Sequence, residues 1–471
     1  MSMKKQFFSL VVLMVGLMMT TSAQSPNLEG VWEGTLSVSG ASLRLIFKIT
    51  KASDGALTAK LDSPDQGALD LPVDSVNVEG SSVRFEMKRF LASFEAKINS
   101  EFTEMSGNWK QGGLELPLVL KRTEKATKLN RPQEPQKPFP YNDEEVSYEN
   151  KKAGNKLAGT LTTPRDNKGP FPAVVLITGS GAQDRNEAIF GHKPFLVLAD
   201  HLTRQGVAVL RVDDRGVGGS TGSGATATTE DFAEDVLAGV EYLKSRKEID
   251  PKHIGLIGHS EGGIIAPMLA TRSGDIAFIV MMAGTGLPGE DIIHLQAGLI
   301  AKAAGSGEKE IAESRKMQER IFAVIKSEKD PKEAEKKLNA LRDEITAGMP
   351  EDMKKAGADK ALDAQFKSVN SPWFRYFTTY DPRPALTKVK CPVLAINGER
   401  DLQVPYKENL GAIEAALKAG GNKDFTVIKL PELNHLFQKA QTGSPGEYGK
   451  IEETISPLAL QTISDWIKKR L

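Results

Sequence analysis

The sequence predicts an α/β domain with a mostly parallel sheet and an inserted helical cap, preceded by a small all-β barrel or sandwich domain. Three observations indicate this fold class. In residues 27–122, apolar and polar side chains alternate with period two between turn residues, which is typical of short antiparallel strands. From about Asp143, short apolar runs alternate with amphipathic segments, as in a parallel sheet covered by helices on both faces. This alternation stops in residues 287–380, where apolar residues have helical spacing without a strand-like run.

Composition excludes several classes of function. The chain has 471 residues, 40% of them hydrophobic, and a formal net charge of zero. A neutral chain favours neither nucleic acid nor an anionic membrane surface as a partner. Cys391 is the single cysteine, so an intramolecular disulfide is impossible and Cys/His metal sites lack ligands. The dinucleotide pattern G-x-G-x-x-G fails at Thr221, and no phosphate-binding loop is found. We therefore expect no cofactor and no metal.

Residues 1–23 have the pattern of a secretory signal peptide. Lys4 and Lys5 form a basic start, and the apolar run Phe7–Met19 is too short to span a bilayer comfortably. The small residues Thr21–Ala23 suit cleavage near Ala23. We therefore predict a secreted or periplasmic protein with no stable membrane span in the mature chain. The alternative is an uncleaved anchor.

The remaining chain is predicted to form an accessory all-β domain at 27–122, a linker at 123–140 and the α/β domain at 141–471. In the all-β domain, the pattern Gly-x-Trp of Gly30–Trp32 occurs again at Gly107–Trp109. Pairing of these two stretches would close a barrel or sandwich. In the linker, spaced prolines prevent a stable helix, so a stiff and exposed segment is expected.

Strands and helices of the α/β domain follow from the apolar runs and their spacing. The expected order is a strand pair, then strands and helices in alternation, the cap, two further strands and a closing helix. The strands are predicted at 146–148, 157–162, 173–177, 207–212, 253–257, 277–282, 392–396 and 425–428, and the helices at 193–205, 230–246, 263–271 and 458–467.

The stretch Gly258–Gly262 reads Gly-His-Ser-Glu-Gly, the pattern G-x-S-x-G. It lies between a predicted buried strand and a predicted Ala-rich helix, which is the setting of a nucleophile elbow. Glycines at its two ends avoid collisions in a crowded turn, and the free N–H groups of the helix start can stabilise an oxyanion. Ser260 is therefore the candidate nucleophile.

A serine hydroxyl needs a base and an orienting acid. With an elbow on such a sheet, the chain order should be serine, acid, histidine, each after a strand. Asp401 follows the strand 392–396 and is the candidate acid, with Glu399 as the runner-up. Of the six histidines, His435 alone follows both the serine and the acid, so it is the candidate base.

The oxyanion hole needs two donors. One should be the backbone N–H of Glu261, the residue after the nucleophile. The other should come from the glycine-containing loop Thr178–Arg185 after the strand 173–177. We favour the N–H of Ser180 or Gly181, and the sequence leaves the choice open. The nearby Asp213–Arg215, two acids and an arginine, are expected to tie loops together beside the site.

These stretches together resemble the α/β-hydrolase superfamily, in particular its secreted bacterial carboxylesterases related to the dienelactone-hydrolase-like and serine-aminopeptidase-like branches. The resemblance covers about residues 143–471 and implies the α/β-hydrolase fold and a covalent acyl-enzyme that water hydrolyses. Thr178 stands where many members have histidine, which leaves the second oxyanion donor less defined. The all-β domain, including Leu61–Gly67, is similar to an accessory domain that precedes some of these hydrolases.

The leading hypothesis is a serine hydrolase of small-molecule carboxylic esters with short acyl chains. In it, Ser260 attacks, His435 is the general base and Asp401 orients the imidazole. A serine peptidase of the same fold is the alternative, with Glu261 or a cap carboxylate as the anchor for a substrate amine. A non-catalytic envelope binding protein is a third. The acyl length, the alcohol, the oligomeric state and the role of the all-β domain stay open.

Overall fold

The computed structural model describes residues 27–38, 41–66, 68–111, 114–125, 129–165, 169–349, 351, 354 and 358–471. The predicted signal peptide, with its cleavage near Ala23, lies outside the described residues. In the described part of the chain, no helix combines the length and the apolar character that a bilayer crossing needs.

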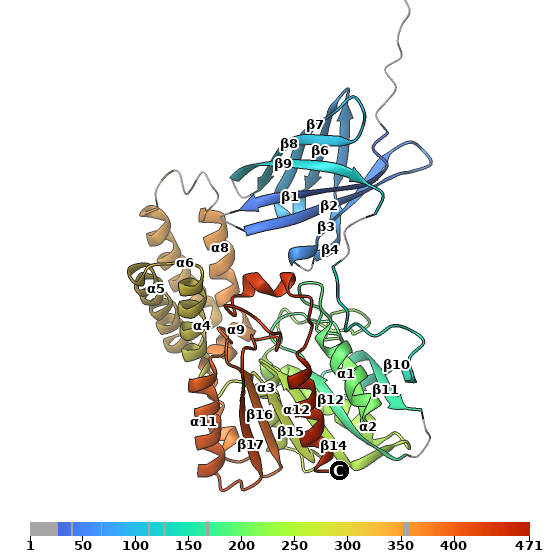
Figure 1. The fold of residues 1–471 in the computed structure, drawn as a ribbon. Helices are drawn as coiled ribbons and strands as arrows, with labels where there is room; N and C mark the ends of the chain where they lie inside the picture. Colours follow the sequence, from blue (N-terminus) through green and yellow to red (C-terminus); the bar gives the residue numbers. More distant parts are fainter. Residues whose placement is uncertain are drawn as a thin grey trace, which may run out of the picture.

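The first part of the chain forms a single antiparallel sheet that curls into a nearly closed barrel (Figure 1). Its order is β4-β3-β2-β1-β9-β8-β7-β6-β5. The barrel core contains Trp32 and the rings of Phe47, Phe85 and Phe94, with ring centroids 4.6 to 6.1 Å apart. The predicted all-β fold is thus confirmed. The strands are β1 Gly30–Val38, β2 Ala41–Lys51, β3 Leu57–Ser63, β4 Ala68–Val73, β5 Ser75–Glu79, β6 Ser82–Met87, β7 Ala92–Ile98, β8 Glu104–Gln111 and β9 Leu114–Thr123.

The two tryptophan-containing stretches do not pair with each other. Strand β9 lies between β1 and β8, so that Trp32 faces Arg122 and Trp109 faces Leu116 in the register. Pairing of Gly30–Trp32 with Gly107–Trp109 was therefore a wrong expectation. The reason is that β7, β8 and β9 form consecutive hairpins, and it is the last of these strands that returns to β1.

The second sheet has eight strands in the order β10-β11-β13-β12-β14-β15-β16-β17. Strand β11 pairs antiparallel with both β10 and β13, and the remaining pairs are parallel. The strands are β10 Tyr141–Asn150, β11 Asn155–Pro164, β12 Phe171–Ile177, β13 Ala208–Val212, β14 Ile249–His259, β15 Phe278–Met282, β16 Val393–Gly398 and β17 Phe425–Leu430.

Helices cover both faces of this sheet, which explains why its central strands are continuous apolar runs. All five residues of β15 are buried, for example, whereas the edge strand β10 exposes many of its side chains. One core packs the sheet against α1 and α12, and the other packs it against α2, α3 and α11. The helices are α1 Pro194–Arg204, α2 Thr229–Lys244, α3 Gly262–Ala270, α11 Tyr406–Ala419 and α12 Pro457–Lys468. The predicted α/β architecture is confirmed.

Between β15 and β16 the chain forms the predicted helical cap. In Figure 1 the cap lies to one side of the sheet and below the barrel. It has a small core of its own, which includes Phe322, Leu338 and Phe366. Its described helices are α4 Gly289–Ala303, α5 Glu308–Ser327, α6 Pro331–Ala347, α8 Ala358–Val369 and α9 Pro372–Thr379, and the short α10 Arg383–Leu386 leads back to the sheet.

The segment that joins the two sheets is anchored to the α/β part by polar side chains. The guanidinium of Arg131 donates to the carbonyls of Phe190, Gly449 and Ile451 at 2.9 to 3.0 Å. The side chain of Gln133 accepts from the N–H groups of Thr454 and Ile455 and donates to the carbonyl of Ile455. Many residues of this linker are exposed, as expected, but polar side chains between its prolines also bind the backbone of the chain's C-terminal part.

Candidate active site

Ser260 lies at a sharp turn between β14, which ends at His259, and α3, which begins at Gly262. Its φ is +52°, a left-handed conformation that is strained for a residue with a side chain. A Cβ on Gly258 would lie 2.0 Å from the carbonyl oxygen of Gly262, and one on Gly262 would lie 2.3 Å from that of Ile177. The strand–turn–helix setting predicted for this serine, and the need for both glycines, are confirmed.

Asp401 and His435 follow neighbouring parallel strands and meet at the carboxyl edge of the sheet. Strand β16 leads to the aspartate and β17 to the histidine. The Nδ1 atom of His435 lies 2.8 Å from Oδ2 of Asp401, and both residues are buried. The other carboxylate oxygen accepts the N–H groups of Gln403 and Val404, each at 2.8 Å. The acid is therefore held in one orientation toward the imidazole.

The carboxylate of Glu399, the runner-up acid, makes its contacts away from His435. Its carboxylate pairs with Lys429 at 2.5 Å and accepts the N–H of Glu432, and both charged side chains are partly exposed. The Lys429 ammonium lowers the pKa of Glu399. The structure thus brings Asp401, and not Glu399, to the histidine.

Ser260 and His435 line one cavity of 280 Å³. Gly179, Ser180 and Glu261 form part of its wall beside the serine. The cap closes the opposite side, through residues of α4 and α9: Ile292, Ile293, Gln296, Trp373, Phe374 and Phe377. The predicted nucleophile and base therefore line the same cavity, at the edge of the sheet beside the cap.

The loop after β12 approaches the serine closely. A Cβ on Gly179 would lie 3.3 Å from Cβ of Ser260. The N–H of Gly179 donates to Oε1 of Glu187 at 2.7 Å, so it is not available to a substrate. Within the described chain, the N–H groups of Ser180, Gly181 and Glu261 have no acceptor. Ser180 lines the cavity, whereas Gly181 lines a neighbouring groove. The geometry thus favours Ser180 over Gly181 as the second donor.

His259 and Glu187 form a buried pair that the sequence did not reveal. Nδ1 of His259 lies 2.9 Å from Oε1 of Glu187, and Nε2 lies 3.0 Å from the carbonyl oxygen of His435. Because a carboxylate and a carbonyl are both acceptors, this arrangement favours a ring with hydrogen on both nitrogens, which is an imidazolium. Burial opposes this charge, but the Glu187 carboxylate outweighs it and raises the pKa of His259. The pair connects the loop around Gly179 to the loop of the candidate base.

Glu261 contributes more to the site than its backbone. The residue is 3% exposed, and its carboxylate accepts the hydroxyl of Thr229 at 2.6 Å and the indole N–H of Trp373 at 2.8 and 3.0 Å. Burial raises the pKa of Glu261, and the bonds from Thr229, Trp373 and Ser180 counteract it in part. This side chain joins the elbow to α2 and to α9 of the cap.

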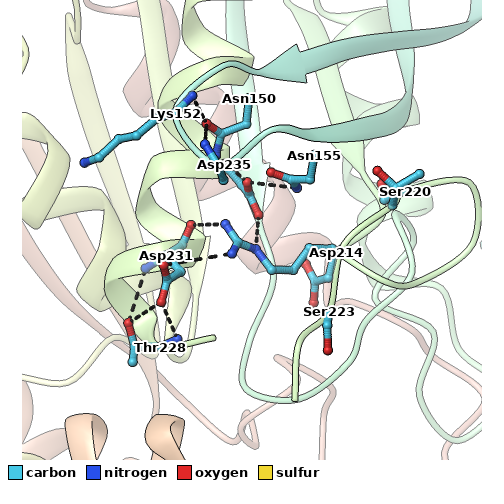
Figure 2. A network of polar contacts seen from close by, with 12 residues as sticks. Asn150, Lys152, Asn155, Asp214, Ser220, Ser223, Thr228, Asp231 and Asp235 are labelled. Atoms are coloured by element: carbon cyan, nitrogen blue, oxygen red, sulfur yellow. Dashed lines mark hydrogen bonds and ion pairs between the residues drawn. The ribbon is translucent and has the colours of Figure 1, made fainter. Parts of the chain in front are cut away.

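The residues Asp213–Arg215 tie loops together, as predicted. Asp213 holds the guanidinium of Arg185 at 2.8 and 3.1 Å. Arg215 donates to Asp235 on α2 at 2.6 Å. The same carboxylate accepts the side-chain amides of Asn150 at 2.7 Å and Asn155 at 3.3 Å (Figure 2). The loop after β13 is thereby anchored to α2 and to the hairpin of β10 and β11.

Asp214 differs from its neighbours because it lacks a cationic partner among the described residues. It accepts the hydroxyl of Thr178 and the N–H of Gln183, both at 2.9 Å. Burial raises the pKa of Asp214 to about 7, and these two bonds work against the shift. Through these bonds the Asp214 carboxyl contacts the loop Thr178–Arg185, which carries the candidate oxyanion donor Ser180.

The site shows no place for a metal among the described residues, since no cluster of three or more His, Cys, Asp or Glu side chains is suited to hold one. What the arrangement offers instead is a hydroxyl on a strained turn, a buried imidazole–carboxylate pair and free backbone N–H groups around one cavity. These are the components of acyl transfer through a serine.

Comparison with known proteins places the chain among hydrolases. The sequence model of a family described as serine aminopeptidase, S33, matches residues 193–439, which is more than half of the chain. Esterase EstD of Thermotoga maritima is 26% identical over 408 residues, which cover 85% of this chain and 88% of EstD. The putative hydrolase YtaP of Bacillus subtilis is 32% identical over 130 residues, 24% of this chain and 42% of YtaP.

Among solved structures, an esterase of Pyrococcus furiosus is 17% identical to this chain with a TM-score of 0.43, over 73% of this chain and 99% of that one. The family match confirms the predicted α/β-hydrolase fold and the prediction that the chain is a hydrolytic enzyme.

Proposed function

The chain belongs to the serine aminopeptidase S33 family, and from this premise we propose that it is a carboxylesterase that uses Ser260, His435 and Asp401 as a catalytic triad. The observation that carries the proposal is the 2.8 Å contact of His435 Nδ1 with Asp401, made by the imidazole that lines the serine's cavity. Esterase EstD, a relative over most of the chain, has this type of activity by name.

In the proposed reaction, Nε2 of His435 accepts the hydroxyl proton while Oγ of Ser260 attacks the ester carbonyl. The N–H groups of Glu261 and Ser180 stabilise the oxyanion. The imidazolium then returns the proton to the leaving alcohol, and an acyl-enzyme forms on the serine. Water, activated by the same imidazole, releases the acid. Asp401 keeps Nδ1 protonated, so that Nε2 is the basic nitrogen throughout.

The carboxylates around the cavity favour an ester over a peptide with a free amino terminus. A peptidase of that kind needs an unpaired acid that binds the substrate ammonium. Glu187 and Glu261 are the carboxylates in the cavity wall, and both are engaged. The first holds Gly179 and His259, and the second holds Thr229 and Trp373.

The size of the cavity supports short acyl chains. The cap covers the serine, and the 280 Å³ that remain suit a small ester rather than a long lipid. We propose substrates with small acyl groups for this reason.

The test compares p-nitrophenyl acetate with an aminoacyl p-nitroanilide as substrates of the full chain. We expect turnover of the ester, labelling by a fluorophosphonate, and loss of both in Ser260→Ala. Turnover of the anilide alone would establish the peptidase. If the wild-type chain cleaves neither substrate and resists the probe, the enzyme proposal is abandoned in favour of a binding protein.

We also propose that the chain is exported and that the mature protein begins near Gln24, as the pattern of residues 1–23 indicates. We further propose the all-β part at 27–122 as an accessory domain, with a linker at 123–140 before the catalytic domain at 141–471. Mass spectrometry of the protein from the envelope fraction of the expressing cell tests the cleavage. An intact Met1 would exclude it.

A further inference from the structure

A groove of 600 Å³ lies beside the catalytic cavity. Much of its wall is apolar, with Ala182, Val217, Ala225 and Phe232. Its charged members are neutralised from within the protein, since Arg215 pairs with Asp235 and the pKa of Asp214 is raised by burial. The groove therefore offers an apolar surface and suits an apolar substituent rather than a charged one.

Ser180 and Trp373 line both the groove and the catalytic cavity. They therefore form the wall between the two spaces. Trp373 contributes most of the bulk, because its indole is much larger than a serine side chain. The tryptophan lies on α9, the cap helix that packs against α2 at this place.

The indole is fixed in this wall from two sides. Its Nε1 donates to both oxygens of Glu261, at 2.8 and 3.0 Å. Its ring stacks on Phe377, with centroids 5.2 Å apart and planes 21° apart. Glu261 directly follows Ser260 in the chain. The indole is thus attached to the nucleophile elbow itself, and its position relative to the reacting atoms is well defined.

We propose that Trp373 determines the substrate size of this enzyme by separating the catalytic cavity from an apolar second subsite. The subsite takes an apolar substituent of an ester once the indole no longer fills the wall. This proposal rests on the proposed esterase function, because it concerns the same cavity. It predicts that the wild-type enzyme is restricted to esters that fit in 280 Å³.

The experiment measures kcat/KM for two ester panels with the wild type and with Trp373→Ala. One panel extends the acyl chain from acetate to decanoate with a constant p-nitrophenol, and the other enlarges the alcohol with a constant acetyl group. The readout is the ratio of the largest to the smallest substrate within each enzyme. A general loss of activity cancels in this ratio, so it reports specificity alone.

We expect the ratio to rise about tenfold or more in Trp373→Ala for one of the panels, because added apolar groups gain a site to occupy. A rise in the acyl panel assigns the groove to the acyl chain, and a rise in the alcohol panel assigns it to the alcohol. Trp373→Phe keeps most of the ring and loses the indole N–H, so its ratio should stay near that of the wild type. Trp373→Leu retains an apolar contact with Phe377 and replaces the alanine variant if that one is unstable.

A second substitution checks that the groove itself is used. Ala225 is exposed and lines the groove, so Ala225→Trp should fill the groove with little disturbance of the fold. In the Trp373→Ala background it should return the ratio to near the wild-type value. The proposal is overturned if the ratio is unchanged in both panels for the alanine and leucine variants, or if Ala225→Trp does not reverse the gain. Failure of the esterase proposal is separate, since the wild type would then hydrolyse no ester in either panel.

Discussion

Two histidine–carboxylate pairs lie side by side in the candidate site. They differ in whether the Nε2 atom of the imidazole has a hydrogen-bond partner. The rings of His259 and His435 have centroids 4.8 Å apart, and each ring contacts a buried carboxylate. Both nitrogens of His259 donate, to Glu187 and to the His435 carbonyl. His435 uses Nδ1 alone, and its Nε2 has no partner among the described residues.

This difference separates a structural imidazole from a candidate base. A base must have a nitrogen that is free to accept a proton. Proximity to the serine and a carboxylate partner are common to both rings, so neither property identifies the base. The unoccupied nitrogen does, and the following predictions test whether the distinction holds.

The largest effect on catalysis is expected from removal of the His435 imidazole, whose Nε2 is free. His435→Ala should lower kcat/KM for p-nitrophenyl acetate by about 10⁴-fold or more, because no other group can take the serine proton. His253→Ala is the matched control, since that ring is partly exposed and pairs with Asp250 on the surface. If His435→Ala retained more than a tenth of the wild-type rate, another base would have to act.

The next effect tests the carboxylate of the same pair. In Asp401→Asn, the oxygen that faces Gln403 and Val404 can remain an acceptor, so the amide NH₂ would face Nδ1 of His435. This arrangement favours the imidazole tautomer with hydrogen on Nε2, which cannot act as the base. We expect kcat to fall by about 10²- to 10⁴-fold with little change in the melting temperature.

Glu399→Gln serves as the control for the aspartate, because that acid pairs with Lys429 instead. Its kinetics should equal those of the wild type. A loss in Glu399→Gln comparable to that in Asp401→Asn would contradict the assignment of the acid.

Substitution in the other pair should affect stability more than the chemical step. Glu187→Gln leaves the buried imidazolium of His259 without a counter-charge, which should cost about 3 kcal/mol of unfolding free energy. We expect about a tenfold loss in kcat, since the loop of Gly179 loses part of its support. Denaturant unfolding and steady-state kinetics measure the two effects. Glu344→Gln, in an exposed pair with Arg320, is the control and should change stability by less than about 1 kcal/mol.

The same variant has a defined pH dependence. The folded state raises the pKa of His259, so its stabilising contribution is full below the unfolded pKa and is lost as the pH rises through the folded pKa. The stability difference between wild type and Glu187→Gln should therefore be larger near pH 6 than near pH 9. A difference that grew with pH would mean that His259 is neutral.

The smallest effect concerns Asp214, a buried carboxyl without a cation beside it. Its pKa is raised to about 7, so ionisation destabilises the fold as the pH rises from the unfolded pKa to about 7. Asp214→Asn removes this cost and can still accept the N–H of Gln183. The melting temperature of the variant relative to wild type should thus increase over that pH range and stay constant above it. If the difference in melting temperature were the same at the low and the high end of this pH range, Asp214 would be ionised over the whole range.

Sequence reasoning located the elements whose positions follow from local pattern and strand order. Ser260 was found from five residues and their flanking strand and helix. Asp401 and His435 were found because neighbouring parallel strands deliver the residues that follow them to one edge of the sheet. The cap was found because a long helical segment cannot be a loop.

Contacts between distant loops could not be found in this way. Glu187 lies in a loop without a motif, and the 72 positions that separate it from His259 carry no signal of their contact. The order of the chain excluded His259 as the base, because it precedes both the serine and the acid. Arg131 and Gln133 were interpreted through the prolines around them, although their side chains bind backbone more than 300 positions away. Such pairings depend on tertiary packing and not on any periodic pattern.

The docked segment before β10 has a consequence for where the catalytic part of the chain begins. Arg131 holds the carbonyl of Gly449, beside Tyr448, whose hydroxyl accepts the side-chain amide of Gln403 at 3.1 Å. Gln403 in turn orients Asp401. Truncation at residue 141 would follow the border that composition suggests, but it would remove Arg131 and its contact with Gly449. Truncation at residue 129 would retain this contact. We therefore expect the smallest fragment that folds and acts on its own to begin near residue 129 rather than at the first strand of its sheet.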